Sequence, residues 1–245
     1  MSPVSSGKNS MITAEVGAEV AVGVAAEVAA EVAAAGSGGH PWTPARGTAT
    51  ITGVPVPDDL PVLAFPDQAA FEAWLEAEHA TAPGLYVRIA KKGSGIASVT
   101  YPEVVESCLC FGWIDGRANS LDERAYLQRI TPRRPRSVWS QKNVAAVGAL
   151  TAAGRMRPAG LAAVEAARAD GRWERAYAGP ATATVPEDLA AALDAVPAAR
   201  AAFDALDGTN RFAVLFRVQT AATAATRTRR IERLVTALAE GRPPA

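Results

Sequence analysis

The segment Arg129–Lys142 contains the residue types of an anion-binding site. It holds five basic residues, one tryptophan and no acidic residue. Guanidinium groups bind phosphate or carboxylate in a bidentate manner, and Trp139 offers an aromatic face for stacking. The pattern predicts a binding surface that includes Arg129, Arg133, Arg134 and Trp139. The structural alternative is that two prolines stiffen this connection, the arginines pair with nearby carboxylates, and the tryptophan anchors the next helix.

A second cluster lies upstream, in the segment Phe111–Arg117. We expect Trp113 and Asp115 to join the arginine-rich surface if the strands that carry the two clusters pair. An enzyme built from these residues would use Asp115 as a base and Arg133 and Arg134 as clamps on a small phosphorylated or carboxylated substrate. The structural alternative is that the aromatic side chains fill an interface between sheet and helix, and that Asp115 accepts hydrogen bonds from backbone amides in a turn.

The sequence lacks the more specific motifs that identify catalytic and metal-binding sites. There is no nucleophile elbow, phosphate-binding loop or dinucleotide fingerprint. The only cysteines, Cys108 and Cys110, lie two apart in a predicted helix, which indicates reduced residues in or near the core rather than a disulfide or a zinc site. We therefore predict no catalytic residue, no metal and no cofactor. The formal net charge of zero argues against nucleic acid as a partner.

The fold class expected from the hydrophobic patterns is α+β, with a small antiparallel sheet of about three strands packed with helices and followed by an all-helical module. Alternation predicts strands at 85–90, 113–115 and 126–130. Asp67 predicts the start of one helix, and a capping box of Thr100 and Glu103 predicts another. Further helices are expected near 141–153, 158–169, 187–195, 198–206, 210–219 and 224–239.

The chain divides by composition into four parts. Residues 1–61 repeat Ala-Glu-Val and then become rich in Gly and Pro, which predicts a disordered tail. An α+β domain is expected over 62–172, a linker over 173–185 and a helical module over 186–241. The apolar side chains of this module are expected to form one core: Phe203, Leu206, Phe212, Leu215, Phe216, Ile231, Leu234, Val235 and Leu238.

Several motifs resemble those of a known bacterial family. They include Ala80–Leu85, Lys91–Gly95, Cys110–Gly116, Leu127–Arg129, Thr131–Ser137, Trp139–Ser140, Gly154–Met156, Pro158–Gly160, Asn210–Arg211 and Thr226–Arg227. Together they resemble the YdeI/OmpD-associated family, named for bacteriocin protection, over about 62–240. The resemblance implies an α+β protein with a C-terminal helical module and a role in resistance to bacteriocins or envelope stress. It brings no catalytic residues.

The leading interpretation is a non-enzymatic binding or interaction protein of this type in the cytoplasm, whose partner is a small anionic ligand or another protein. No stretch reaches the ~20 consecutive apolar residues of a membrane helix. The alternative is an uncharacterised enzyme acting on a small anionic substrate. In either case the predicted site residues are Trp113, Asp115, Arg129, Arg133, Arg134 and Trp139.

Overall fold

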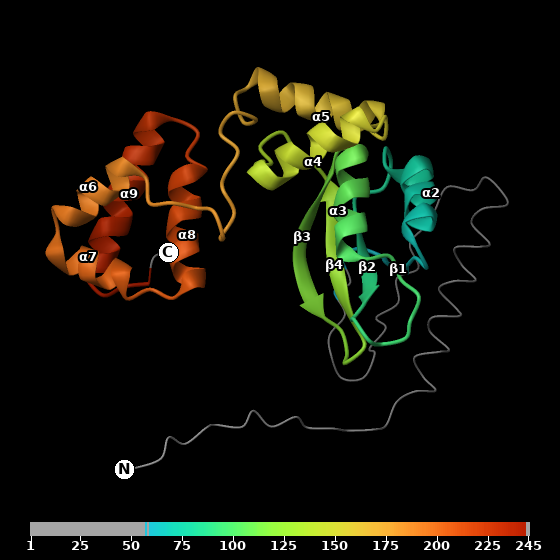
Figure 1. Cartoon of the computed structure of the whole chain (residues 1–245), viewed down its shortest axis with the longest axis horizontal. Coiled ribbons are helices and arrows are strands. Elements are labelled where there is room, and N and C mark those ends of the chain that lie inside the picture. The colour runs from blue at the N-terminus through green and yellow to red at the C-terminus, as the bar shows by residue number, and fades with distance from the viewer. Residues whose placement is uncertain (1–56, 58, 244–245) are drawn as a thin grey trace, which may run out of the picture. The chain divides into compact units, whose positions relative to one another are not determined.

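The computed structural model describes residues 57 and 59–243 (Figure 1). Most of the predicted tail, 1–61, therefore lies outside the described residues. Its last residues contact the sheet domain: Leu60 packs on a small apolar cluster around Tyr86, and the Tyr86 hydroxyl donates a hydrogen bond to Asp59 at 3.1 Å. The sheet domain thus draws on residues from Asp59 onward.

The sheet has four strands in the order β1-β2-β4-β3. Strand β1 (Val62–Ala64) is parallel to β2 (Leu85–Ala90), while β4 (Ala125–Pro132) is antiparallel to both β2 and β3 (Trp113–Ser120). The α+β class is confirmed, but the expected number of three strands is wrong. The missed strand, β1, has only three residues between two prolines, which is too short to show an alternating pattern.

Helices α2 (Gln68–Glu78) and α3 (Tyr101–Cys110) contribute to the main core of the sheet domain, and Figure 1 shows α3 lying along the sheet. Both predicted helix starts are confirmed. The Asp67 carboxylate accepts a hydrogen bond from the Ala70 amide at 2.8 Å, and Thr100 and Glu103 form the capping box.

Two further helices, α4 (Gln141–Ala152) and α5 (Pro158–Ala169), complete this core. Gly160 of α5 lies directly on the C-terminal end of α3. A Cβ atom placed there would lie 2.7 Å from the Leu109 carbonyl oxygen and closer still to that of Cys110. The helices can approach this closely only because residue 160 has no side chain.

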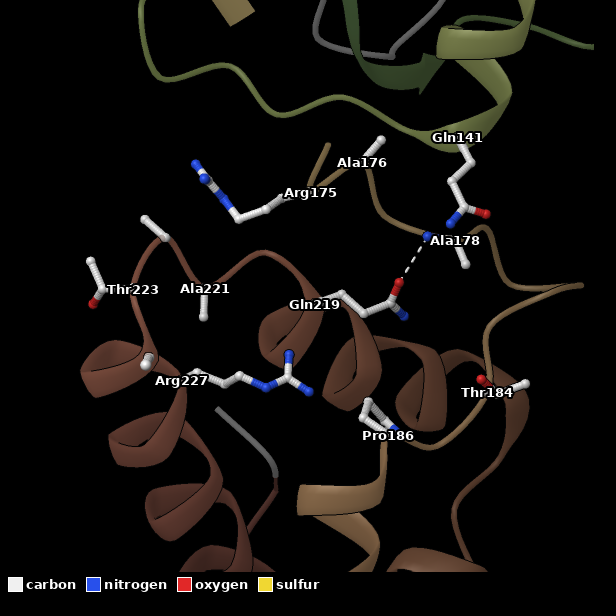
Figure 2. Close-up of a pocket in the computed structure, with 12 residues that line it drawn as sticks. Gln141, Arg175, Ala176, Ala178, Thr184, Pro186, Gln219, Ala221, Thr223 and Arg227 are labelled. Atoms are coloured by element: carbon white, nitrogen blue, oxygen red, sulfur yellow. Dashed lines mark hydrogen bonds between the residues drawn. The ribbon is translucent and has the colours of Figure 1, made fainter. Parts of the chain in front are cut away.

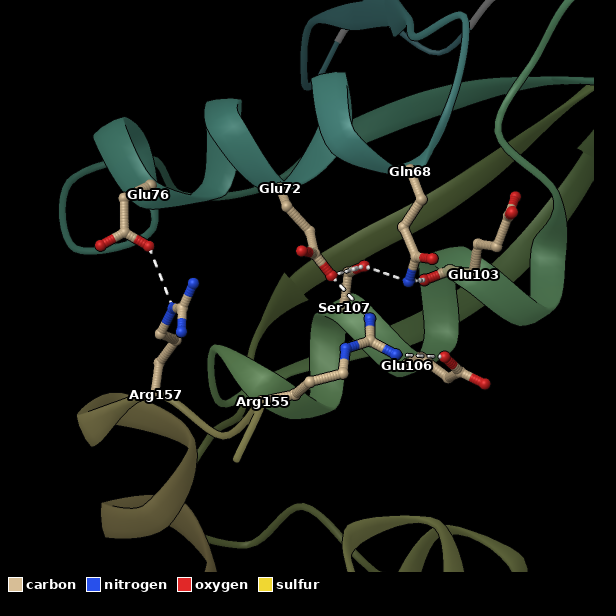
Figure 3. Close-up of polar contacts among 8 residues, drawn as sticks. All are labelled: Gln68, Glu72, Glu76, Glu103, Glu106, Ser107, Arg155 and Arg157. Carbon is tan, nitrogen blue, oxygen red and sulfur yellow. Dashed lines mark hydrogen bonds and ion pairs between the residues drawn. The ribbon is translucent and has the colours of Figure 1, made fainter. Parts of the chain in front are cut away.

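An ion-pair network ties the connection between α4 and α5 to α2 and α3 (Figure 3). The Arg155 guanidinium binds Glu72 of α2 and Glu106 of α3, both at 2.8 Å, and the Ser107 hydroxyl donates to Glu72 at 2.9 Å. A second pair joins Arg157 to Glu76 at 3.2 Å. These contacts hold the connection that presents Gly160 to α3.

The C-terminal helices are α6 (Glu187–Asp194), α7 (Pro197–Asp204), α8 (Gly208–Gln219) and α9 (Ala224–Ala239). All six helices expected beyond residue 140 are confirmed, each end within two residues of its predicted place. The module has its own core, formed by Leu189, Leu193, Ala199, Phe203, Val214, Leu215, Val218, Ile231, Leu234, Val235 and Leu238.

Phe212 and Phe216 were expected in that core and are only half-buried. The ring of Phe216 instead packs edge-on against Tyr177, with the ring centroids 4.8 Å apart. The helical spacing placed Phe216 on the apolar side of α8, but the residue lies at the margin of that side, where the chain before α6 covers it. The phenylalanine that lies in the core of this module is therefore Phe203.

Candidate functional site

Arg133 is the centre of the candidate site. It follows the last residue of β4, and its guanidinium carbon lies 3.7 Å from the ring centroid of Trp139. Nη1 donates a hydrogen bond to the Val138 carbonyl at 3.2 Å. Nε and Nη2 are buried and have no hydrogen-bond partner among the described residues. These two nitrogens form the edge of the guanidinium with which arginine binds a carboxylate or phosphate in a bidentate manner.

Trp139 supplies a third donor of the same kind. Its ring is buried between Arg133 and Trp173, whose ring centroid lies 5.0 Å away. The indole Nε1 is also buried without a partner among the residues that the structure describes. One stacked pair thus presents three N–H donors without an acceptor, although most buried polar groups in proteins are paired.

Asp115 and two tyrosines surround this pair. Asp115 lies opposite Ile130 in the β3–β4 register, on the helix-covered face of the sheet, and accepts a hydrogen bond from the Tyr101 hydroxyl at 2.7 Å. Tyr177 is fixed beside Trp139 because its amide donates to the Trp139 carbonyl at 2.9 Å. Arg133 and Tyr177 both lie close enough to Asp115 to sense its charge. We call Tyr101, Asp115, Arg133, Trp139 and Tyr177 the Arg133 cluster.

The protonation states of the cluster follow from burial. Burial lowers the pKa of the Arg133 guanidinium to about 10, and the charge of Asp115 opposes that shift. Burial raises the pKa of the Tyr101 hydroxyl, and the hydrogen bond to Asp115 adds to the rise. The pKa of Tyr177 is raised by burial first and then by the charge of Asp115. At neutral pH the arginine is therefore charged, and both tyrosines are neutral hydrogen-bond donors.

The other three predicted site residues lie apart from the cluster. Trp113 belongs to the core, is 1% exposed and packs edge-on against Trp74. Arg129 lies on the opposite face of the sheet and pairs with Asp59 at 3.1 Å. The side chain of Arg134 is exposed to solvent. The structure therefore brings together only three of the six predicted residues.

The structural alternative for Asp115, in which it accepts hydrogen bonds from the backbone amides of a turn, is wrong. The segment around Gly116 was interpreted as a turn, with Asp115 bonded to backbone amides. Strand β3 instead continues through Gly116 to Ser120, with a register shift between Asp115 and Ala118. The carboxylate therefore meets a side chain of α3 rather than the amides of a turn.

Tyr101 and Tyr177 were not among the predicted residues. Tyr101 is the first residue of α3, directly after the capping box, and Tyr177 lies in the predicted linker. Polar aromatic residues at a helix start and in a linker give no local indication of a site. Only the sheet register and the path of the chain after α5 bring them to Arg133.

The cysteines offer no nucleophile to the cluster. Cys108 and Cys110 are free and buried, as expected, and burial raises the pKa of both thiols. Neither is a thiolate at neutral pH. Within the described part of the chain, no group of three or more His, Cys, Asp or Glu side chains could hold a metal ion.

A hollow of about 500 Å³ lies beside the linker and the helical module (Figure 2). Arg227 is already paired, whereas Gln219 is paired only through its oxygen, because its Nε2 is buried without a hydrogen-bond partner among the described residues. Arg227 binds Asp188 through Nε and Nη2 at 2.6 and 2.8 Å, and the Gln219 side-chain oxygen accepts the Ala178 amide at 2.8 Å. None of the six predicted site residues lines this hollow, so it is a separate feature from the Arg133 cluster.

The chain is thus an α+β protein with a helical C-terminal module. At the end of its sheet it carries a buried cluster of hydrogen-bond donors. Residues 182–241 match the family described as Bacteriocin-protection, YdeI or OmpD-Associated, which confirms the suspected family at the helical module. Residues 63–163, where most of the suggestive motifs lie, match a domain of unknown function, DUF8412. No curated protein and no solved structure matches the chain.

None of the described helices is long and apolar enough to cross a membrane.

Proposed function

We propose that the protein is a non-enzymatic binding protein of the YdeI/OmpD-associated type, and that it binds a small oxyanion through the Arg133 cluster. Its cellular role in this proposal is resistance to bacteriocins or envelope stress, exercised from the cytoplasm. The role is suggested by the name of the family that the helical module matches. The observation that carries the proposal is the unpaired Nε and Nη2 edge of Arg133.

Unpaired donors favour a ligand that supplies oxygen atoms. A buried N–H group without an acceptor costs about 1–3 kcal/mol, and more when the group is charged. A carboxylate, phosphate or phosphonate places two oxygens against Nε and Nη2 at once, which removes that cost and adds charge-assisted hydrogen bonds. The stacking on Trp139 fixes the plane of the guanidinium before the ligand arrives, so less conformational freedom is lost on binding.

Asp115 narrows the choice of ligand. Its carboxylate lies near Arg133 without forming an ion pair with it. A ligand oxyanion at Arg133 therefore also meets a fixed negative charge. A ligand that carries a hydroxyl or N–H group next to its oxyanion can donate to Asp115 and offset that repulsion.

Binding is favoured over catalysis by two features of the cluster. In the enzymatic alternative, Arg133 and Arg134 both clamp the substrate, but the side chain of Arg134 is exposed and lies outside the cluster. The proposed base, Asp115, already accepts a hydrogen bond from Tyr101. The three N–H donors need only an acceptor, so binding alone accounts for them.

The donor nitrogens are covered in the described conformation, so a ligand reaches them only when covering side chains move aside. Tyr101 is 39% exposed, at the solvent side of the cluster, and we expect it to be one of the side chains that move. We therefore expect binding to be slower than diffusion and the bound protein to melt at a higher temperature.

The test uses methylphosphonate as a monoanionic probe, with isothermal titration calorimetry on the full chain. We expect Arg133→Lys to weaken binding at least about tenfold, because lysine keeps the charge and loses the bidentate edge, and one charge-assisted hydrogen bond contributes about 1.5–3 kcal/mol. Arg134→Gln, in the same loop but exposed, is the control and should bind like the wild type.

Two results would contradict the proposal. One is an Arg133→Lys variant that binds methylphosphonate as the wild type does. The other is a wild-type protein that binds no oxyanion probe. In cells that lack the protein, the Arg133→Lys variant should also fail to restore survival in the presence of a bacteriocin, whereas Arg134→Gln should restore it.

A further inference from the structure

A cavity of about 610 Å³ lies beside the Arg133 cluster, between the end of β2 and the start of α3. Its volume falls within the range of ligand pockets, about 300–1,000 Å³, although it is open to solvent rather than enclosed. The cavity is lined by two lysines, by serine, threonine and tyrosine hydroxyls, and by two loop glycines, and none of its described lining residues is acidic. The residues that the argument uses are Lys91, Lys92, Ser94, Thr100, Tyr101 and Tyr126.

The lysines keep their positive charge available to a ligand. Lys91 donates a hydrogen bond to the Asp122 backbone carbonyl at 2.6 Å, which orients its ammonium group without neutralising it. Lys92 is exposed and forms no ion pair with any described residue. Arg124 adds a third positive charge to this loop, because its Nη2 donates to the Ser94 carbonyl at 2.9 Å.

The Glu103 carboxylate, at the start of α3, already accepts hydrogen bonds from the amide and the hydroxyl of Thr100, both at 2.7 Å, and the Asp122 carboxylate is turned toward the backbone. One oxygen of Asp122 accepts the amides of Arg124 and Ala125, both at 2.7 Å. The loop is also open on its outer side: a Cβ atom at Gly93 or Gly95 would meet nothing within 4 Å. A ligand can therefore approach the loop backbone as well as the lysines.

Tyr101 connects the cavity to the Arg133 cluster. It is among the residues that line the cavity, and its hydroxyl touches Asp115, which lies beside Arg133. A rotation of Tyr101 away from Asp115 would thus open a path between the cavity and the Arg133 cluster. The two ends of that path would each carry positive charge, from Arg133 at one end and from the lysines at the other.

We propose that the ligand is a small dianion whose two oxyanion groups bind at these two ends, one at Arg133 and the other at Lys91 and Lys92. This inference rests on the proposed function, because it extends the site that Arg133 defines. It assigns a second subsite and a ligand class, a compact molecule with two carboxylate, phosphate or phosphonate groups.

The test compares methylphosphonate with a series of α,ω-alkane bisphosphonates of increasing chain length, by isothermal titration calorimetry. When two oxyanion groups belong to one molecule, binding of the first group holds the second near its own subsite. The second binding step is then intramolecular. We therefore expect one chain length to bind at least about tenfold tighter than methylphosphonate, and Lys92→Gln to bring that affinity down to the level of methylphosphonate. Lys142→Gln removes the same charge from an exposed position of α4 and should keep the preference for that chain length.

The outcomes separate this inference from the proposed function. If every bisphosphonate binds only as well as methylphosphonate, the second subsite does not exist and the Arg133 site stands. If Lys142→Gln weakens the bisphosphonate as much as Lys92→Gln does, the effect is one of general charge and the inference is overturned. If no probe binds at all, both proposals fail together.

Discussion

Gly160→Ala is expected to destabilise the sheet domain by about 3 kcal/mol in a urea unfolding experiment. The added methyl group would meet the carbonyl oxygens of Leu109 and Cys110, which are backbone atoms and cannot move aside by a change of rotamer. Helix α5 would have to shift away from α3, and overpacking of this kind costs about 1–3 kcal/mol or more.

Gly148→Ala is the matched control for that prediction. Gly148 also lies inside a helix, α4, and is exposed, and a Cβ atom there would meet nothing within 4 Å. Alanine favours a helix interior over glycine by about 0.5–1 kcal/mol, so this variant should be slightly more stable than the wild type. Equal stability of the two variants would show that the close approach of α5 to α3 does not constrain residue 160.

Phe203→Ala is expected to destabilise the helical module by about 3–5 kcal/mol, the usual range for truncating a buried phenylalanine. The ring of Phe203 is fully buried in the core of the module, and the Arg211 guanidinium covers it at 4.4 Å from the ring centroid. The measurement is the loss of helical circular dichroism on heating or in urea.

Phe216→Ala removes the same side chain from a half-buried position of α8 and is the control for Phe203→Ala. Its ring contacts Tyr177 and Phe212 rather than the module core, so the loss of stability should be clearly smaller. If both variants lose the same stability, the module has no separate core around Phe203.

Most secondary structure was predictable because its signals are local. The Asp67 and Glu103 carboxylates each accept a hydrogen bond from an amide three residues away, so the sequence alone reveals where α2 and α3 begin. Strand β1 depends instead on pairing with β2, more than twenty residues away, and its three residues have no pattern of their own. Its position became visible only in the folded sheet.

The candidate site was predictable in part. Arg133 and Trp139 stand out by residue type, and their stacking needs only a short loop between them. The choice between Arg129 and Arg133 could not be made from residue type, because it depends on which face of the sheet each one reaches. Arg129 lies opposite Tyr86, on the face turned away from α3, whereas Asp115 lies opposite Ile130 on the helix-covered face. The register of strand pairing decides on which face of the sheet each of these side chains lies.

The backbone of the linker is held at Tyr177 and Ala178 and reaches the surface in the turn that follows. The carbonyl of Tyr177 accepts the Gln141 amide at 2.9 Å, whereas residues 180–182 are exposed. A protease needs an accessible stretch of chain that can be drawn into an extended form. Limited digestion should therefore nick the chain at 180–182 and leave Tyr177 with the larger fragment. The two pieces would separate the segment that matches DUF8412 from nearly all of the segment that matches the bacteriocin-protection family.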